Sequence, residues 1–90
     1  MGLTPDQVLD LQHKFEDILK KHHDVVEHVS NDHVVDDYIF TFKIAPVSLL
    51  RLKKFEKDVK HMDYYVDINT ITRKENDDWM FDIIVCYPDD

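Results

Sequence analysis

The chain has almost no glycine: Gly2 is the only one among 90 residues. Phosphate-cradling loops, dinucleotide-binding turns and nucleophile elbows need glycine where the backbone turns sharply or approaches a ligand. None of these can be built here, which excludes the nucleotide-dependent enzymes and hydrolases that use them. We therefore expect a protein without enzyme activity and without a cofactor.

Cysteine is equally scarce, and long apolar runs are missing. Cys86 is the single cysteine, so it cannot form an internal disulfide, which fits a reducing compartment. No apolar segment is long enough to cross a membrane, and residues 1–6 lack the basic and hydrophobic regions of a signal peptide. These absences predict a cytoplasmic protein.

Positive charge is in short supply, and it is concentrated in one segment. The formal net charge is −8. Residues 46–61 hold five basic and two acidic side chains, a net +3, so the remaining residues carry −11. A field of this sign discourages nucleic acid and anionic membranes and favours a basic protein partner.

Segments in which apolar residues recur at helical spacing are followed by segments in which they recur at strand spacing. Thr4 and Gln7 form a capping box with Pro5 at the first helical position. Pro46 ends a strand and is expected to open the second helix, whose apolar positions include Leu49. The pattern predicts helices over about 4–22 and 46–62, strands over about 25–29, 38–44, 64–70 and 79–87, and turns at 30–33 and 74–78.

Two stretches repeat each other. Residues 36–42 and 77–83 each carry a paired acid, an aromatic residue and an alternating apolar run. The element order is therefore a doubled αββ unit in a single α+β domain over residues 1–90, with halves at about 4–45 and 46–88. We expect a two-layer sandwich in which two helices cover one face of a four-stranded, mainly antiparallel sheet.

The sheet face away from the helices is predicted to be unusually apolar. Alternation sends a set of large apolar residues to this side, although polar neighbours dilute it. Large apolar surface patches usually mark contacts, so we expect a homodimer or a docked partner here. The candidate residues are Ile39, Tyr65, Ile71, Met80 and Ile84.

Histidines and carboxylates gather around the first predicted strand and the turn that follows it. His22, His23, His28 and His33 lie within twelve residues and have the donor types that zinc prefers. Their spacing matches no compact ligand pattern, and a hairpin would send alternate side chains to opposite faces. Adjacent acids such as Asp36 and Asp37 also diverge in an extended chain. We expect neither a metal site nor a catalytic carboxylate pair.

The acidic side chains could imitate the phosphates of nucleic acid. Nucleic-acid-binding proteins recognise phosphates through lysine and arginine. Another protein can therefore block their binding surfaces by presenting carboxylates. We expect the acidic face to contain Asp36, Asp37, Asp77 and Asp78, with Glu27 and Asp32. In size, acidity and near absence of glycine the chain resembles the small acidic DNA-mimic proteins of phages, such as anti-restriction proteins and uracil-glycosylase inhibitors. The resemblance implies a viral inhibitor that competes with nucleic acid for a basic host protein.

Two alternatives stay open. The chain could be an adaptor or chaperone-like module that binds partners through the apolar back of its sheet. It could also bind nucleic acid directly through the basic helix over residues 46–61, although the surrounding negative charge opposes this.

Overall fold

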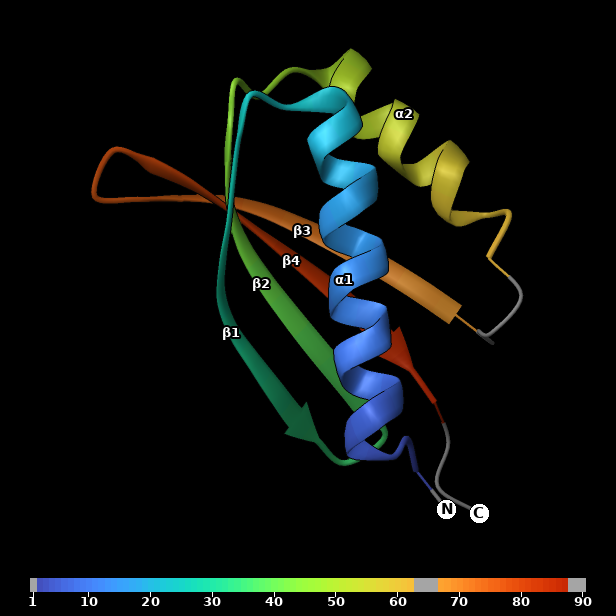
Figure 1. The fold of residues 1–90 in the computed structure, drawn as a ribbon. Coiled ribbons are helices and arrows are strands. Elements are labelled where there is room, and N and C mark those ends of the chain that lie inside the picture. The colour runs from blue at the N-terminus through green and yellow to red at the C-terminus, as the bar shows by residue number, and fades with distance from the viewer. Residues whose placement is uncertain (1, 63–66, 88–90) are drawn as a thin grey trace.

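The computed structural model describes residues 2–62 and 67–87 and has the predicted α+β architecture, with two helices and a four-stranded antiparallel sheet (Figure 1). The predicted third-strand residues Tyr64, Tyr65 and Val66 lie outside the described residues. In chain order the elements are α1 (Pro5–His22), β1 (Val25–Val34), β2 (Asp37–Ala45), α2 (Leu49–Val59), β3 (Asp67–Glu75) and β4 (Asp78–Cys86).

The sheet has the strand order β1-β2-β4-β3, and all neighbouring strands are antiparallel. Strands β2 and β4, one from each αββ half, therefore lie side by side at the centre. Both helices lie on the same side of this sheet (Figure 1). We call the side that they cover the helix face and the opposite side the outer face.

Four phenylalanine rings join the helices to the helix face. Phe15 of α1 packs edge-on against Phe40 of β2 with 5.2 Å between ring centroids. Phe55 of α2 packs edge-on against Phe81 of β4 at 5.1 Å, and Phe15 and Phe55 lie 6.4 Å apart. All four rings are buried. Since each half supplies one helical ring and one strand ring, the two halves share one core.

The first helix starts as predicted, but the second starts later. Thr4 caps α1 through the predicted box with Gln7. In the second half the cap is Ser48, whose hydroxyl accepts from the Arg51 N–H, so α2 begins at Leu49 rather than at Pro46.

Leu49, one of the apolar positions of the predicted second helix, does not join the core. Its side chain is 69% exposed. At about 100° per residue it lies roughly 120° around α2 from Phe55, which together with Val59 carries the buried face. Leu49 therefore points away from the core.

The turn predicted at residues 30–33 is also wrong, because these residues continue β1. Ser30 pairs with Thr41 and His33 with Tyr38, after an irregularity in register between His28 and Ser30. Tertiary pairing overrides the turn preference of this polar stretch. The chain turns instead at Val35, which takes a positive φ of 54°.

The second hairpin turns later and more tightly than predicted. β3 continues to Glu75, and the chain reverses at Asn76 and Asp77, whose φ angles are 50° and 69°. Two-residue hairpin turns of this kind need positive φ, which asparagine and aspartate tolerate better than most residues. Asp78 is therefore the first residue of β4.

Candidate functional site

The outer face has an apolar centre on the two middle strands. Ile39 of β2 pairs directly with Ile84 of β4. Met80 lies along β4 on the same face, and Ile71 of β3 sits opposite Asp82 and is 50% exposed. Four of the five predicted contact residues therefore share one face. Tyr65, the fifth, lies outside the described residues.

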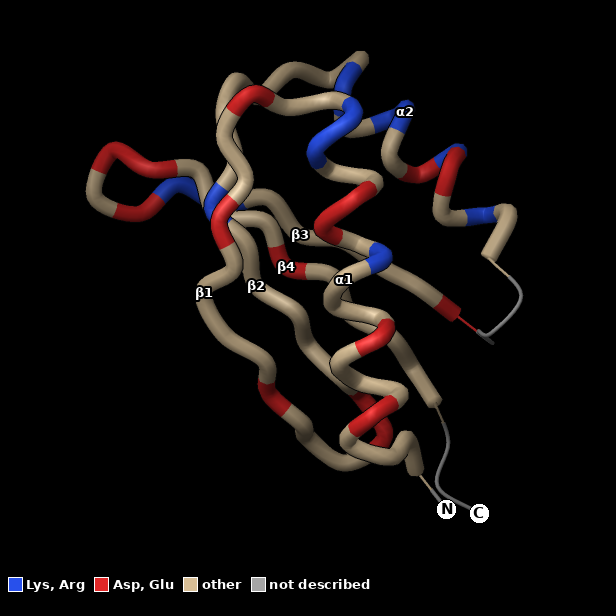
Figure 2. The backbone as a smooth tube through the Cα atoms, viewed as in Figure 1, with Lys and Arg blue, Asp and Glu red and all other residues tan. Residues whose placement is uncertain are grey.

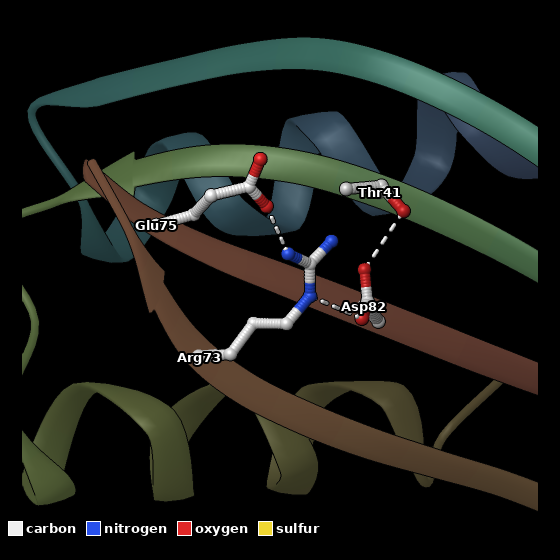
Figure 3. Close-up of polar contacts among 4 residues, drawn as sticks. All are labelled: Thr41, Arg73, Glu75 and Asp82. Carbon is white, nitrogen blue, oxygen red and sulfur yellow. Dashed lines mark hydrogen bonds and ion pairs between the residues drawn. The ribbon is translucent and has the colours of Figure 1, made fainter.

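A polar network lies beside this apolar centre (Figure 3). The Thr41 hydroxyl donates a 2.8 Å hydrogen bond to one Asp82 oxygen, and Arg73 Nε donates at 3.0 Å to the other. Arg73 Nη1 donates to Glu75. The bonds to Asp82 first, and then to Glu75, raise the pKa of the Arg73 guanidinium. Three strands of the sheet are thus linked across the outer face.

The four acids predicted at the starts of the second and fourth strands do not gather in one place. In the ladder between β2 and β4, Asp37 lies opposite Cys86, whereas Asp78 is the first residue of β4 at the other end. Asp78 and Cys86 are eight positions apart along β4, about 27 Å at 3.4 Å per residue. The pairs Asp36–Asp37 and Asp77–Asp78 therefore occupy opposite ends of the sheet (Figure 2).

One of these ends gains an acid that was not among the predicted partner-binding residues. Asp67 at the start of β3 pairs with Cys86 and so lies on the outer face near Asp37. Burial first, and then the negative charges of Asp37, Asp36 and Asp67, raise the pKa of the Cys86 thiol. Asp32, paired with Ile39, lies one outer-face position further along. We call Asp32, Asp36, Asp37 and Asp67 the acidic corner.

The opposite end of the outer face carries mixed charge. Lys43 Nζ lies 3.5 Å from Asp78. Glu27 pairs with Lys43 in the register between β1 and β2, so it belongs to this end and not to the acidic corner. Of the six predicted acidic residues, the structure therefore gathers Asp32, Asp36 and Asp37.

The histidines have separate contacts. His22 Nε2 and Asp58 Oδ2 are 2.7 Å apart, and this hydrogen bond lowers the pKa of the Asp58 carboxyl. His28 bonds Asn31, and His33 stacks on Tyr38 with 4.0 Å between centroids. Within residues 2–62 and 67–87, no group of three histidine, cysteine or acidic side chains could hold a metal ion.

His23 is the one buried histidine among the described residues. Its side chain is 4% exposed, and its Nδ1 lies 2.7 Å from the Pro46 carbonyl oxygen, to which it donates. Burial, the largest effect, lowers the pKa of the imidazole. Its Nε2 finds no hydrogen-bond partner within residues 2–62 and 67–87. The ring is therefore a neutral structural element that joins the end of α1 to the segment before α2.

Some of the basic residues gather where the end of α1 meets α2. The last turn of α1 carries Lys20 and Lys21, which lie near the basic α2 (Figure 2). Arg51 donates to the His22 carbonyl oxygen and so caps the C-terminus of α1. A hollow of about 360 Å³ lies here, lined in part by Lys21, Arg51 and Lys54. Sequence reasoning assigned the positive charge to α2 alone.

A larger cavity of about 500 Å³ lies between α2 and β3. Phe55 and Val59 of α2 and Ile68 of β3 supply apolar walls, and Glu56 and Lys60 add charge. The first half of β3 thus borders open space on the side of α2.

Comparison with known proteins gives no relative. No family model, curated protein or solved structure matches the chain. Across residues 2–62 and 67–87, neither helix combines the length and the apolarity needed to cross a membrane.

Proposed function

We propose that this chain is a non-enzymatic protein-binding protein whose interface is the outer face of its sheet. The observation that carries the proposal is the pairing of Ile39 with Ile84 at the centre of a face turned away from both helices. Burying apolar surface stabilises a complex by about 25 cal/mol per Å² before the costs of association. An apolar centre with a polar rim is the usual anatomy of such an interface.

The charges around this centre define the partner. Asp32, Asp37 and Asp67 border it at one end of the outer face, and the whole chain carries −8. A partner with an apolar contact surface and lysine or arginine at its rim complements this arrangement. Opposite charges steer the encounter and reject acidic competitors.

The acidic corner supports a second, narrower function. Its carboxylates lie close enough together for three of them to raise the pKa of one thiol. A partner that uses its basic surface to bind nucleic acid would meet these carboxylates in place of phosphates. The chain would then act as a competitive inhibitor of nucleic-acid binding. Asp77 and Asp78, at the other end of the sheet, take no part in this corner.

Capture of host proteins by the immobilised chain tests the proposal. Ile84→Asp places a charge in the apolar centre and should abolish capture. Leu50→Asp, at a residue of α2 that is 64% exposed, is the matched control and should not. Binding by the apolar centre should persist between about 0.05 M and about 0.5 M salt, where the screening length falls several-fold.

Other results would point elsewhere. Capture that survives Ile84→Asp overturns docking on the outer face. Capture that disappears at high salt and with Asp37→Asn, while tolerating Ile84→Asp, assigns binding to the acidic corner alone. Released partners that bind DNA only without the chain would then identify the inhibitor function.

A further inference from the structure

Among residues 2–62 and 67–87, β3 is an edge strand, with β4 on one side and no strand paired on the other. It is last in the order β1-β2-β4-β3 and pairs with β4 over its whole length. A row of its backbone N–H and C=O groups therefore points away from the sheet. Residues 67–72 contain no lysine, arginine or proline, the residues that commonly protect such edges. This half of β3 can accept another extended strand.

The space beside this edge is also suitable. The cavity of about 500 Å³ separates α2 from Ile68 and Thr70, two β3 residues on the helix face. Side chains of an added strand that point to the helix face would run along this cavity. α2 therefore leaves room for such a strand.

The charges of β3 are complementary to those of a second β3. Asp67 and Arg73 both lie on the outer face, with Thr70 midway between them. If two β3 strands pair antiparallel about a twofold axis at Thr70, Asp67 of each copy lies opposite Arg73 of the other. Directly opposed charges of unlike sign stabilise a strand pair. The pair would contain two such contacts.

Other symmetric registers lack this match. Opposed residues must share a sheet face, so the twofold axis has to pass through a residue. An axis at Ile71 would put Asp67 opposite Glu75, a repulsive contact formed twice. An axis at Asn69 or Thr72 brings no opposite charges together. The charges therefore select the register centred on Thr70.

Arg73 has the capacity for the additional contact. Its Nε donates to Asp82 and its Nη1 donates to Glu75. The guanidinium has five N–H donors, of which Nη2 carries two. Asp67 of a second copy can therefore bind Arg73 without breaking the network in Figure 3.

We propose that two copies of this chain join through β3, antiparallel, with Thr70 on the twofold axis. The two four-stranded sheets become one continuous sheet of eight strands. Since this axis is perpendicular to the sheet, both outer faces lie on the same side of the dimer. The pairing is inferred from the free edge of β3 and from the charges along it, so it does not depend on the proposed function. It would double the docking surface.

Disulfide trapping tests the register. Opposed Cα atoms in an antiparallel pair are about 5 Å apart, within the limit of about 7 Å for a disulfide. Thr70→Cys in a Cys86→Ala background should give a covalent dimer under mild oxidation. Thr72→Cys in the same background is the control, because its two copies would lie about 13 Å apart along the strands. Equal trapping at both positions, or trapping at Thr72 alone, overturns the register.

Sedimentation equilibrium tests the dimer without cross-linking. The wild type should dimerise, and Asp67→Arg should raise the dissociation constant about tenfold or more by reversing both charge pairs. Asp17→Arg, on an exposed position of α1, makes the same change in net charge and should not weaken the dimer.

Three outcomes would overturn the pairing. They are a monomeric wild type, an equal response to the two substitutions, and a dimer that tolerates Asp67→Arg but dissociates with Ile84→Asp. The last would place the second copy on the outer face. A monomer that still captures partners in an Ile84-dependent way would leave the docking function standing.

Discussion

Asp37 and Asp78 occupy equivalent positions in the two αββ halves, yet they lie at opposite ends of the central strand pair. The reason is that β2 and β4 are antiparallel, so the starts of equivalent strands point away from each other. A repeat of this kind separates its acidic elements instead of concentrating them. The acidic corner is completed by Asp67 from the second half, which reaches it through the register between β3 and β4.

The shared aromatic core should dominate stability. Phe55→Ala removes a fully buried ring that contacts both Phe15 and Phe81, and should lower the free energy of unfolding by about 3–5 kcal/mol. Leu50→Ala on the same helix should change it by no more than about 0.5 kcal/mol because Leu50 is exposed. Urea denaturation followed by circular dichroism measures both. Equal losses would contradict the described packing.

The Thr41–Asp82 contact should be costly to break from one side. Thr41 is 5% exposed, so Asp82→Ala leaves a buried hydroxyl without its acceptor, at a cost of about 1–3 kcal/mol. Thr41→Val added to Asp82→Ala should restore part of the loss. Glu75→Ala, at the exposed end of the network, should cost less than about 0.5 kcal/mol. If the effects of Thr41→Val and Asp82→Ala on stability were additive, the hydrogen bond between Thr41 and Asp82 would not form.

Stability should fall in mild acid through His23. Its pKa is lowered by burial, so the unfolded chain takes up a proton at about pH 6.5 while the folded chain does so only at lower pH. Its contribution is fully present above pH 6.5 and is lost as the pH falls toward the folded pKa. The stability difference between wild type and His23→Gln should therefore shrink between about pH 8 and about pH 5.5. A constant difference in urea midpoint would argue against a neutral buried ring.

The acidic corner should slow the chemistry of Cys86. Burial and the neighbouring carboxylates raise its pKa, and the thiolate is the reactive form. Asp37→Asn removes one of these charges and should speed alkylation by iodoacetamide at about pH 8, below the ordinary thiol pKa of about 8.5. Asp78→Asn, at the opposite end, should leave the rate unchanged. Equal alkylation rates in the two variants would contradict the grouping of these carboxylates around Cys86.

Local patterns in the sequence were enough for the element order and for the two faces of the sheet. The capping box at Thr4 and the alternation around Phe40 depend on near neighbours, so they could be recognised directly. The length of β1 could not, because Ser30 and the polar residues after it are extended only by virtue of pairing with β2.

The candidate site depended on contacts that no local pattern contains. Asp67 reaches the acidic corner through strand register, and Arg51 caps α1 through the packing of two helices. The repeat led us to group the acids at the starts of β2 and β4. These acids lie apart because the two strands are antiparallel. A signal existed for the apolar centre, because Ile39 and Ile84 alternate with core residues on both middle strands.

Site-specific photo-cross-linking tests the docking role of the outer face most directly. A photoreactive amino acid in place of Ile84 should form covalent adducts with other polypeptides in cell extract, and one in place of Leu50 on α2 should not. Circular dichroism would verify that both variants fold. Adducts formed from position 50 but not from position 84 would contradict the account, since the partner would then contact the helices and leave the outer face free.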